Sequence, residues 1–485
     1  MKTQNTSESW PASDSNGARQ TLNAARADKT KARFSEFDIR YVWTALVMAH
    51  GGGLAIASYL GWQLGTQGNL PADFPIWIQV HGQLQLVGWL DLFIMGVSLY
   101  FIPRLAGVPI RRRRWHSWVL PLTTAGLVGE AVARLIFSWA ATGWRTVLRA
   151  AVVCGGIAQW LGLTGYIVIL AGVALAAPRG KDSGLEKLHP FFLIMIVGWI
   201  VYATLTALFG FVMAVNSDMM ATRAWNQWSV QVDLMFVLFP VAYAFSVRNF
   251  PHFLYLPPVA GPIARWGWAY ATAALVTLVG LNPLSLAAAP KLALALAAIG
   301  RTITDAIVLW LIWDLNVFLR TRPLPYILAE KSPLNPNPPP KPWRNWFNHA
   351  NWGRPEWIIR GAYVWLALGS MAELVGTAAH FIEPRIGLAP DFLRHVFLLG
   401  FITPLILGMA QKMVPGFLHK RRIAFPGLSL WIFVLINASV IARTLPWLLP
   451  GHSTAALYGL ALSGPLALVA LALFAWNLWA TAHHV

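Results

Sequence analysis

Cysteine and charged residues are both scarce in this sequence. Its 485 residues include one cysteine, Cys154, and only 12% are charged, against roughly 25% in an ordinary soluble domain. A single cysteine excludes an intrachain disulfide, a cysteine-ligated iron–sulfur cluster, a zinc ribbon and covalent attachment of a c-type haem. The low charge, together with 57% hydrophobic residues, excludes an ordinary soluble fold. Any bound metal must use ligands other than cysteine.

The sequence contains many long apolar runs. Runs of about 20 residues recur along almost the whole chain, which is the length a helix needs to cross the hydrocarbon layer. Transmembrane strands would be about 10 residues long and would alternate in polarity. We therefore expect an all-α polytopic membrane protein with about twelve transmembrane helices in the lipid bilayer. These begin near Tyr41, Trp77, Trp115, Thr146, His189, Gln227, Ile263, Pro290, Trp357, Asp391, Pro426 and Thr454.

Acidic residues are also in deficit, with 19 Asp and Glu against 37 Lys and Arg. Twenty-eight of the basic residues fall in the N-terminal tail and in the loops after helices 2, 4, 6, 8 and 10, and five fall in the opposite loops. Because short cytoplasmic loops carry an excess of Lys and Arg, both termini are predicted to be cytoplasmic. Basic residues spread over alternate loops do not indicate nucleic-acid binding. Residues 1–39, which lack the apolar segment of a signal peptide, are expected to form a polar cytoplasmic tail.

One segment occurs three times, in the second, sixth and tenth expected helices. The copies are Gly88 to Leu105, Phe236 to Phe253 and Gly400 to Phe417. The first and third copies share two glycines eight residues apart and a proline seven residues later, and the middle copy keeps the proline. Glycine and proline are also common in membrane helices generally, which is the alternative explanation.

Copies at every fourth helix predict three four-helix repeats within a single transmembrane domain, residues 40–485. The expected repeats are residues 40–176, 189–318 and 357–480. A Pro-rich cytoplasmic linker, residues 319–356, joins the second repeat to the third, and its composition is typical of an extended spacer.

Histidines stand at one depth in three of the expected helices. His81 lies about one turn into the second helix, His395 lies at the matching depth of the tenth, and His380 lies near the outer end of the ninth. Imidazole is the commonest biological metal ligand, and histidines on two helices can hold a haem between them. A hydrogen-bonded packing role is the alternative for any one of them. Equal depth on repeat-related helices favours His81 and His395 as haem ligands.

Arginines occupy the same outer level, against the overall charge trend. Arg134, Arg394 and Arg443 need anions there, and haem propionates, an anionic substrate or nearby carboxylates would serve. Arg134 has a local partner in Glu130, four residues earlier on the same helix face. We expect no such local partner for Arg394 or Arg443, and predict that both balance anionic groups in the outer leaflet.

Two further features carry polar residues into the membrane. Glu373, Thr377 and His380 form one stripe of the ninth helix, which orients a ligand, conducts protons or joins helices. His50, followed by three glycines, is a further candidate metal ligand, although helix packing explains the glycines comparably well. In the eighth helix we expect Arg301 to pair with Asp305.

This pattern resembles the haem–copper oxidase subunit I superfamily. Within it, HGQLQLVGWLDLFIMGVSLYFIPRLAGVP and RHVFLLGFITPLILGMAQKMVPGF look most like the NnrS family of bacterial membrane proteins, which contain haem and copper and protect cells against nitric oxide. The resemblance implies haem b with His81 and His395 as axial ligands, copper as a second metal, nitric oxide as a ligand, and a place in the bacterial cytoplasmic membrane. His380 and His50 are the other candidate metal ligands.

The sequence also departs from the oxidase pattern. Oxidases place copper or iron on a histidine of helix 6 and a histidine pair at helix 7, and they carry two histidines in helix 10. Here the membrane parts of helices 6 and 7 have none, and helix 10 has only His395. We therefore expect no oxidase-type dinuclear centre.

Three functions remain open on the sequence alone. The first is a haem-binding membrane protein of nitric oxide metabolism or nitrosative-stress defence, which acts by nitric oxide binding, electron transfer or protection of iron. The second is a secondary transporter with a buried pathway of Arg, Asp and Glu. The third is a scaffold for partner complexes. Neither a catalytic residue nor an electron donor is identified.

Overall fold

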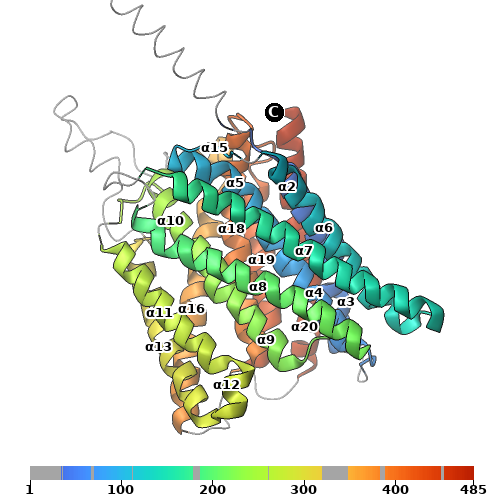
Figure 1. Ribbon diagram of the computed structural model, residues 1–485. Helices are drawn as coiled ribbons and strands as arrows, with labels where there is room; N and C mark the ends of the chain where they lie inside the picture. The colour runs from blue at the N-terminus through green and yellow to red at the C-terminus, as the bar shows by residue number, and fades with distance from the viewer. Residues whose placement is uncertain are drawn as a thin grey trace, which may run out of the picture.

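The computed structural model describes residues 34, 36–66, 70–111, 113–178, 186–259, 261–318, 348–382, 388–448 and 453–485. Most of the expected cytoplasmic tail and of the Pro-rich linker lies outside these residues. The described chain contains twelve long helices, numbered here helix 1 to helix 12, and no strand (Figure 1).

Eight of these helices are continuous α-helices. In chain order, helices 3, 4, 5, 7, 8, 9, 11 and 12 are α6 (Arg113–Ile136), α7 (Thr142–Ala176), α8 (His189–Asn216), α11 (Ile263–Leu281), α13 (Pro290–Asp314), α16 (Pro355–Ile382), α19 (Leu428–Thr444) and α20 (Thr454–His484).

The other four helices each contain a π-helical segment between two α segments. Helix 1 consists of α2 (Arg40–Val47), η1 (Met48–Leu54) and α3 (Ala55–Thr66). Helix 2 consists of α4 (Phe74–Gln83), η2 (Leu84–Asp91) and α5 (Leu92–Ala106). Helix 6 consists of α9 (Arg223–Val232), η5 (Asp233–Leu238) and α10 (Phe239–Phe253). Helix 10 consists of α17 (Pro390–His395), η7 (Val396–Ile402) and α18 (Thr403–Phe417).

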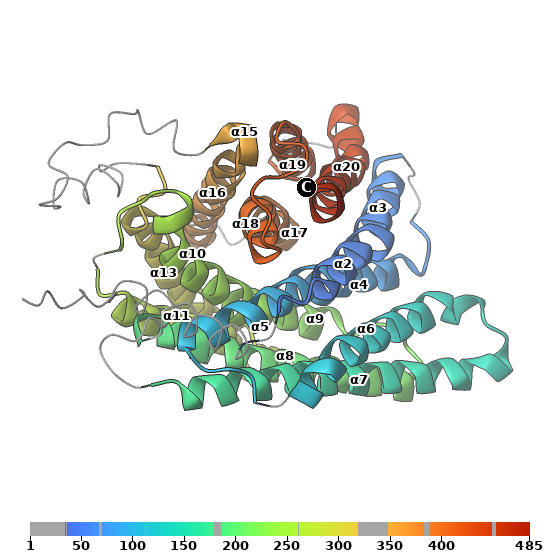
Figure 2. The ribbon, with the colours of Figure 1, turned by 90° about the horizontal axis from the view of Figure 1, so that it is seen from above.

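Eleven of the twelve helices are long and apolar enough to cross a membrane. The remaining one, α11, has 19 residues and packs beside α13 at the edge of the bundle (Figure 2). The expectation of an all-α polytopic membrane protein is confirmed. Figure 2 also shows the first four helices, the next four and the last four as consecutive groups around the bundle.

The helices that carry the repeated segment form the centre of the bundle. The most apolar stretches of helices 2, 6 and 10 are 89%, 78% and 72% buried, whereas the other eight spanning helices are 33–50% buried. Those outer helices expose large apolar side chains such as Leu175 and Trp118, as expected for a surface that contacts lipid tails. The repeated segment therefore supplies the protein core.

The π-helical segments fall at the same place in each copy of the repeat. η2, η5 and η7 surround Gly88, Phe236 and Gly400, the first residues of the three copies. A π-helical turn holds more residues than an α-helical turn, so it widens the helix locally. Such turns are frequent at functional sites. This correspondence supports the proposal of three four-helix repeats.

Both described ends of the chain lie on one side of the bundle. Helix 1 begins and helix 12 ends at the top of Figure 1, on what is called here the terminal face. A chain that crosses the membrane an even number of times has both of its ends on the same side. On the positive-inside rule, we predict that the terminal face is cytoplasmic.

Reporter fusions test this orientation. Alkaline phosphatase inserted at Arg111 is expected to be inactive and green fluorescent protein at the same point fluorescent, because the loop remains in the cytoplasm. A matched fusion at Ala140, between helices 3 and 4, should behave in the opposite way. Active phosphatase at Arg111 would invert the topology.

Candidate functional site

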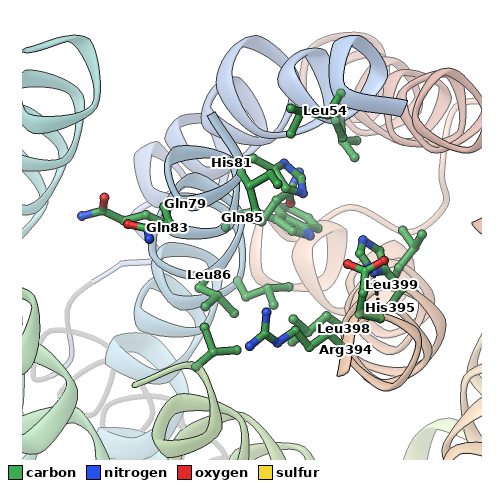
Figure 3. A pocket seen from close by; sticks show the side chains of 18 of the residues that line it. Leu54, Gln79, His81, Gln83, Gln85, Leu86, Arg394, His395, Leu398 and Leu399 are labelled. Atoms are coloured by element: carbon green, nitrogen blue, oxygen red, sulfur yellow. Dashed lines mark hydrogen bonds and ion pairs between the residues drawn. The ribbon is translucent and has the colours of Figure 1, made fainter. Parts of the chain in front are cut away.

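A cavity of about 220 Å³ lies among helices 1, 2, 3, 5, 6, 10, 11 and 12. It reaches Leu64 near the end of helix 1 and Arg443 near the end of helix 11, so it lies toward the face opposite the termini. Two of the predicted ligands, His81 and His395, line it from helices 2 and 10 and face each other across it in Figure 3. The cavity is also lined by all three predicted arginines, Arg134, Arg394 and Arg443.

Both histidines are held by a backbone carbonyl at Nδ1. His81 Nδ1 lies 2.8 Å from the carbonyl oxygen of Gly53 in helix 1, and His395 Nδ1 lies 2.8 Å from that of Asp391. A carbonyl can only accept, so each Nδ1 donates, and in the neutral ring Nε2 keeps its lone pair. Metal-binding histidines in proteins are commonly fixed by such a bond at the other ring nitrogen. Each ring, when neutral, could therefore bind a metal through Nε2.

Two glycines lie where helix 1 approaches helix 2. A Cβ atom on Gly53 would collide with the side chain of Gln85, and one on Gly52 would collide with Leu84. The π segment η1, which contains both glycines, lies against η2. This contact brings the Gly53 carbonyl within reach of His81.

Asp391 connects His395 to Arg443. Its carboxylate oxygen Oδ2 accepts a hydrogen bond of 2.6 Å from Arg443 Nη2, and Oδ1 lies 3.4 Å from His395 Nδ1. Arg443 thus finds an anion within the protein, from helix 10. Asp391 was not selected in the sequence analysis, although its place four residues before His395 was a usable signal.

Arg394 has a free donor beside the cavity. Its side chain is directed toward the cavity in Figure 3, and its buried Nε has no hydrogen-bond partner among the described residues. Arg443 Nε is likewise buried without a partner there. The described residues that line this cavity include three arginines, Arg134, Arg394 and Arg443, and two carboxylates, Glu130 and Asp391, so the lining has an excess of positive charge.

Arg134 is instead fully engaged in a buried polar network. Its guanidinium donates to Glu130 Oε1 at 3.4 Å, to Gln83 Oε1 at 3.0 Å and to Gln79 Oε1 at 2.9 Å. Glu130 Oε2 also accepts a bond of 2.6 Å from Gln159. The predicted Arg134–Glu130 pair is present, and the glutamines that complete it were missed because they come from helices 2 and 4.

The other two candidate metal ligands do not line the cavity. His50 bonds the Leu46 carbonyl of its own helix at 2.7 Å, and His380 is exposed on helix 9. Among the described residues, no three His, Cys, Asp or Glu side chains come together to hold a metal ion. The structure therefore brings together His81 and His395, but neither His50 nor His380 with them.

The predicted pairing of Arg301 is corrected by the structure. Arg301 Nε lies 3.3 Å from Glu373 Oε1, so the ion pair joins helices 8 and 9 rather than two turns of helix 8. This contact accounts for one member of the Glu373, Thr377 and His380 stripe as a helix-joining residue.

Comparison with known proteins supports the fold. The sequence matches no protein-family model and no curated protein. Among solved structures, the chain is similar to a haem–copper terminal oxidase dimer determined by cryo-EM, with a TM-score of 0.60 and 13% identity. The match covers 92% of this chain and 83% of that one. The expected haem–copper oxidase subunit I-like fold is confirmed, whereas the finer resemblance to NnrS has no counterpart in these matches.

Proposed function

We propose that this protein is a haem-binding protein of the bacterial cytoplasmic membrane that acts in nitric oxide metabolism or nitrosative-stress defence. One observation carries the proposal: two histidines on different core helices face one cavity, and each has its Nδ1 bonded to a carbonyl. The oxidase-like fold and the excess of positive charge at the same cavity support it.

His81 and His395 would hold the haem iron through Nε2. The group would be haem b, because the lone Cys154 allows no c-type attachment. Arg394 and Arg443 would bind its propionates, since a guanidinium pairs well with carboxylates and both have a buried Nε without a partner in the described chain. Haem supplies one-electron chemistry and a site for diatomic ligands.

The protein's own residues set the properties of such a site. The Gly53 and Asp391 carbonyls fix the two imidazole rings and raise the basicity of Nε2. Two imidazoles suit electron transfer, whereas a diatomic ligand would need one of them to leave. His395, whose carbonyl partner is on its own helix, has the more local support, while His81 depends on the contact between helices 1 and 2.

No catalytic residue is proposed. Besides the two histidines the cavity offers Asp391, whose carboxylate is bonded to Arg443, and no group of three His, Cys, Asp or Glu side chains in the described chain could hold a metal ion. A copper ion, which the resemblance also implies, would need ligands that are not grouped among the described residues. We therefore propose nitric oxide binding, electron transfer or protection of iron rather than reduction at a dinuclear centre.

Replacing Arg394 with glutamine tests its role beside the haem. Loss of a positive charge stabilises the oxidised iron, so we expect the midpoint potential to fall by several tens of millivolts, where about 59 mV is a tenfold change in a one-electron equilibrium. Redox titration of the purified protein measures this. Arg145→Gln, an exposed arginine near the same face, is the control. An unchanged potential in Arg394→Gln would mean that Arg394 only reaches toward lipid headgroups.

The nitric oxide role is tested in cells. A strain that lacks the gene is complemented with wild-type protein or with His395→Ala and exposed to a nitric oxide donor. We expect the wild type to restore growth and the variant to fail at equal membrane levels. Growth that does not depend on either protein would refute the role in nitrosative stress and leave the haem assignment untouched.

A further inference from the structure

Two buried aspartates at the centre of the bundle make no hydrogen bond to another described residue. Asp91 ends the π segment of helix 2, and Asp233 begins that of helix 6. Both side chains are 0% exposed. All four of their carboxylate oxygens lack a partner among the described residues. Since buried polar groups are nearly always satisfied, two carboxylates in this state need a physical explanation.

Along helices 2 and 6, the two aspartates stand between residues that line the cavity at His81 and residues that line a second cavity. On helix 2, Trp89 and Leu90 line the first cavity, whereas Phe93 and Ile94 line the second. On helix 6, Val230 lines the first cavity and Leu238 the second. The second cavity, of about 100 Å³, is lined almost wholly by apolar side chains.

Among the described residues, no basic side chain pairs with either carboxylate. Asp233 interacts electrostatically with Asp91, and the other groups that interact with the pair are Trp199 and Tyr202 of helix 5 and Tyr166 of helix 4. The nearby buried arginine of helix 3, Arg134, is paired with Glu130 instead. The Trp199 side chain is 0% exposed and directed at Asp91, and its Nε1 has no hydrogen-bond partner of its own in the described chain.

Two ionised carboxylates cannot share such a site without a counter-charge. Burial of an unpaired charge costs far more than burial of a neutral acid, and neighbouring like charges add to the cost. We propose that Asp91 and Asp233 together form a proton-binding site that holds at least one proton at neutral pH. The site exchanges that proton with the His81 cavity.

The lining of the two cavities determines the direction of exchange. Tyr202 lines the His81 cavity and lies within electrostatic range of Asp91, Asp233 and Glu130. Its hydroxyl group can pass a proton between the cavity and the pair. Toward the terminal face, the second cavity offers Ser98 as its one polar lining side chain, and Ser98 is bonded to Tyr166. We assign the exchange to Tyr202 because it lines the His81 cavity directly, whereas Tyr166, which also interacts with Asp91, reaches the apolar second cavity only through Ser98.

Infrared spectroscopy tests the proposal on the full-length purified protein, with or without cofactor. At pH 7 the wild type should show the C=O stretch of a protonated carboxyl group, which shifts in D₂O. Asp91→Asn combined with Asp233→Asn should remove this band. If the double variant does not fold, each single substitution should still weaken or shift the band. Asp73→Asn, which removes a carboxylate bonded to Trp77 near the surface, should leave it intact.

Tyr202→Phe tests the route. The carboxyl band should remain, and its exchange in D₂O should become at least tenfold slower. A wild type without the band, or a band that survives the double substitution, would overturn the proposal. So would a wild type whose thermal stability falls when sodium is replaced by choline while that of the double variant does not, because the pair would then bind a metal cation. Unchanged exchange in Tyr202→Phe would refute the route.

Discussion

Replacing either His81 or His395 with alanine is expected to abolish the low-spin haem spectrum of the purified protein. Each imidazole would hold the haem iron through Nε2, because its other ring nitrogen is already bonded to a carbonyl. Loss of one ring leaves the iron either five-coordinate and high-spin or absent. Absorption spectra and the haem-to-protein ratio of the variants measure the effect.

His484→Ala is the matched control for these substitutions. His484 is exposed near the end of helix 12. It lies on the terminal face, whereas the cavity lies toward the opposite face. The absorption spectrum of the His484→Ala variant should equal that of the wild type. A low-spin spectrum that survives in both His81→Ala and His395→Ala would place the haem on other ligands.

Arg134→Met is expected to destabilise the protein severely. The substitution leaves Glu130, which is 1% exposed, as a buried charge without its counter-ion. Removal of one partner from a buried ion pair typically costs about 3–5 kcal/mol. The variant also releases the Gln79 and Gln83 acceptors and the Met219 carbonyl. Denaturant unfolding in detergent should show the loss.

A second substitution separates the ion pair from the packing of helix 3. Glu130→Leu added to Arg134→Met removes the orphaned charge, and buried pairs replaced by apolar residues are often nearly neutral. The double variant should recover at least half of the lost stability. A single-variant loss below about 1 kcal/mol, the value of an exposed pair, would mean that water reaches this network.

Features that depend on local sequence were predictable. Apolar run lengths gave the twelve helices, because a membrane imposes one length on every span. The spacing of Gly88, Gly96 and Pro103, repeated in helix 10, selected the helices that prove to be the buried centre. Glu130 and Arg134 were paired correctly, since four residues is one helical turn.

Features that depend on contacts between helices were not predictable. Arg443 bonds Asp391, which is 52 residues away in the sequence. Arg301 pairs with Glu373 on another helix rather than with Asp305 on its own helix. The π segments were not predicted either, because their extra residue has no compositional signature and becomes visible only in the backbone. Asp91 and Asp233 were missed for a different reason: each is a single acid in an apolar run, and only the fold places them together.

The most direct test of the central claim is the haem content of the wild-type protein expressed with ample haem supply. Spectroscopy of the oxidised protein should show one non-covalent haem b per chain with the low-spin signature of two imidazole ligands. A colourless, metal-free protein that is folded and stable would contradict the account. The cavity between His81 and His395 would then be the pathway of a transporter.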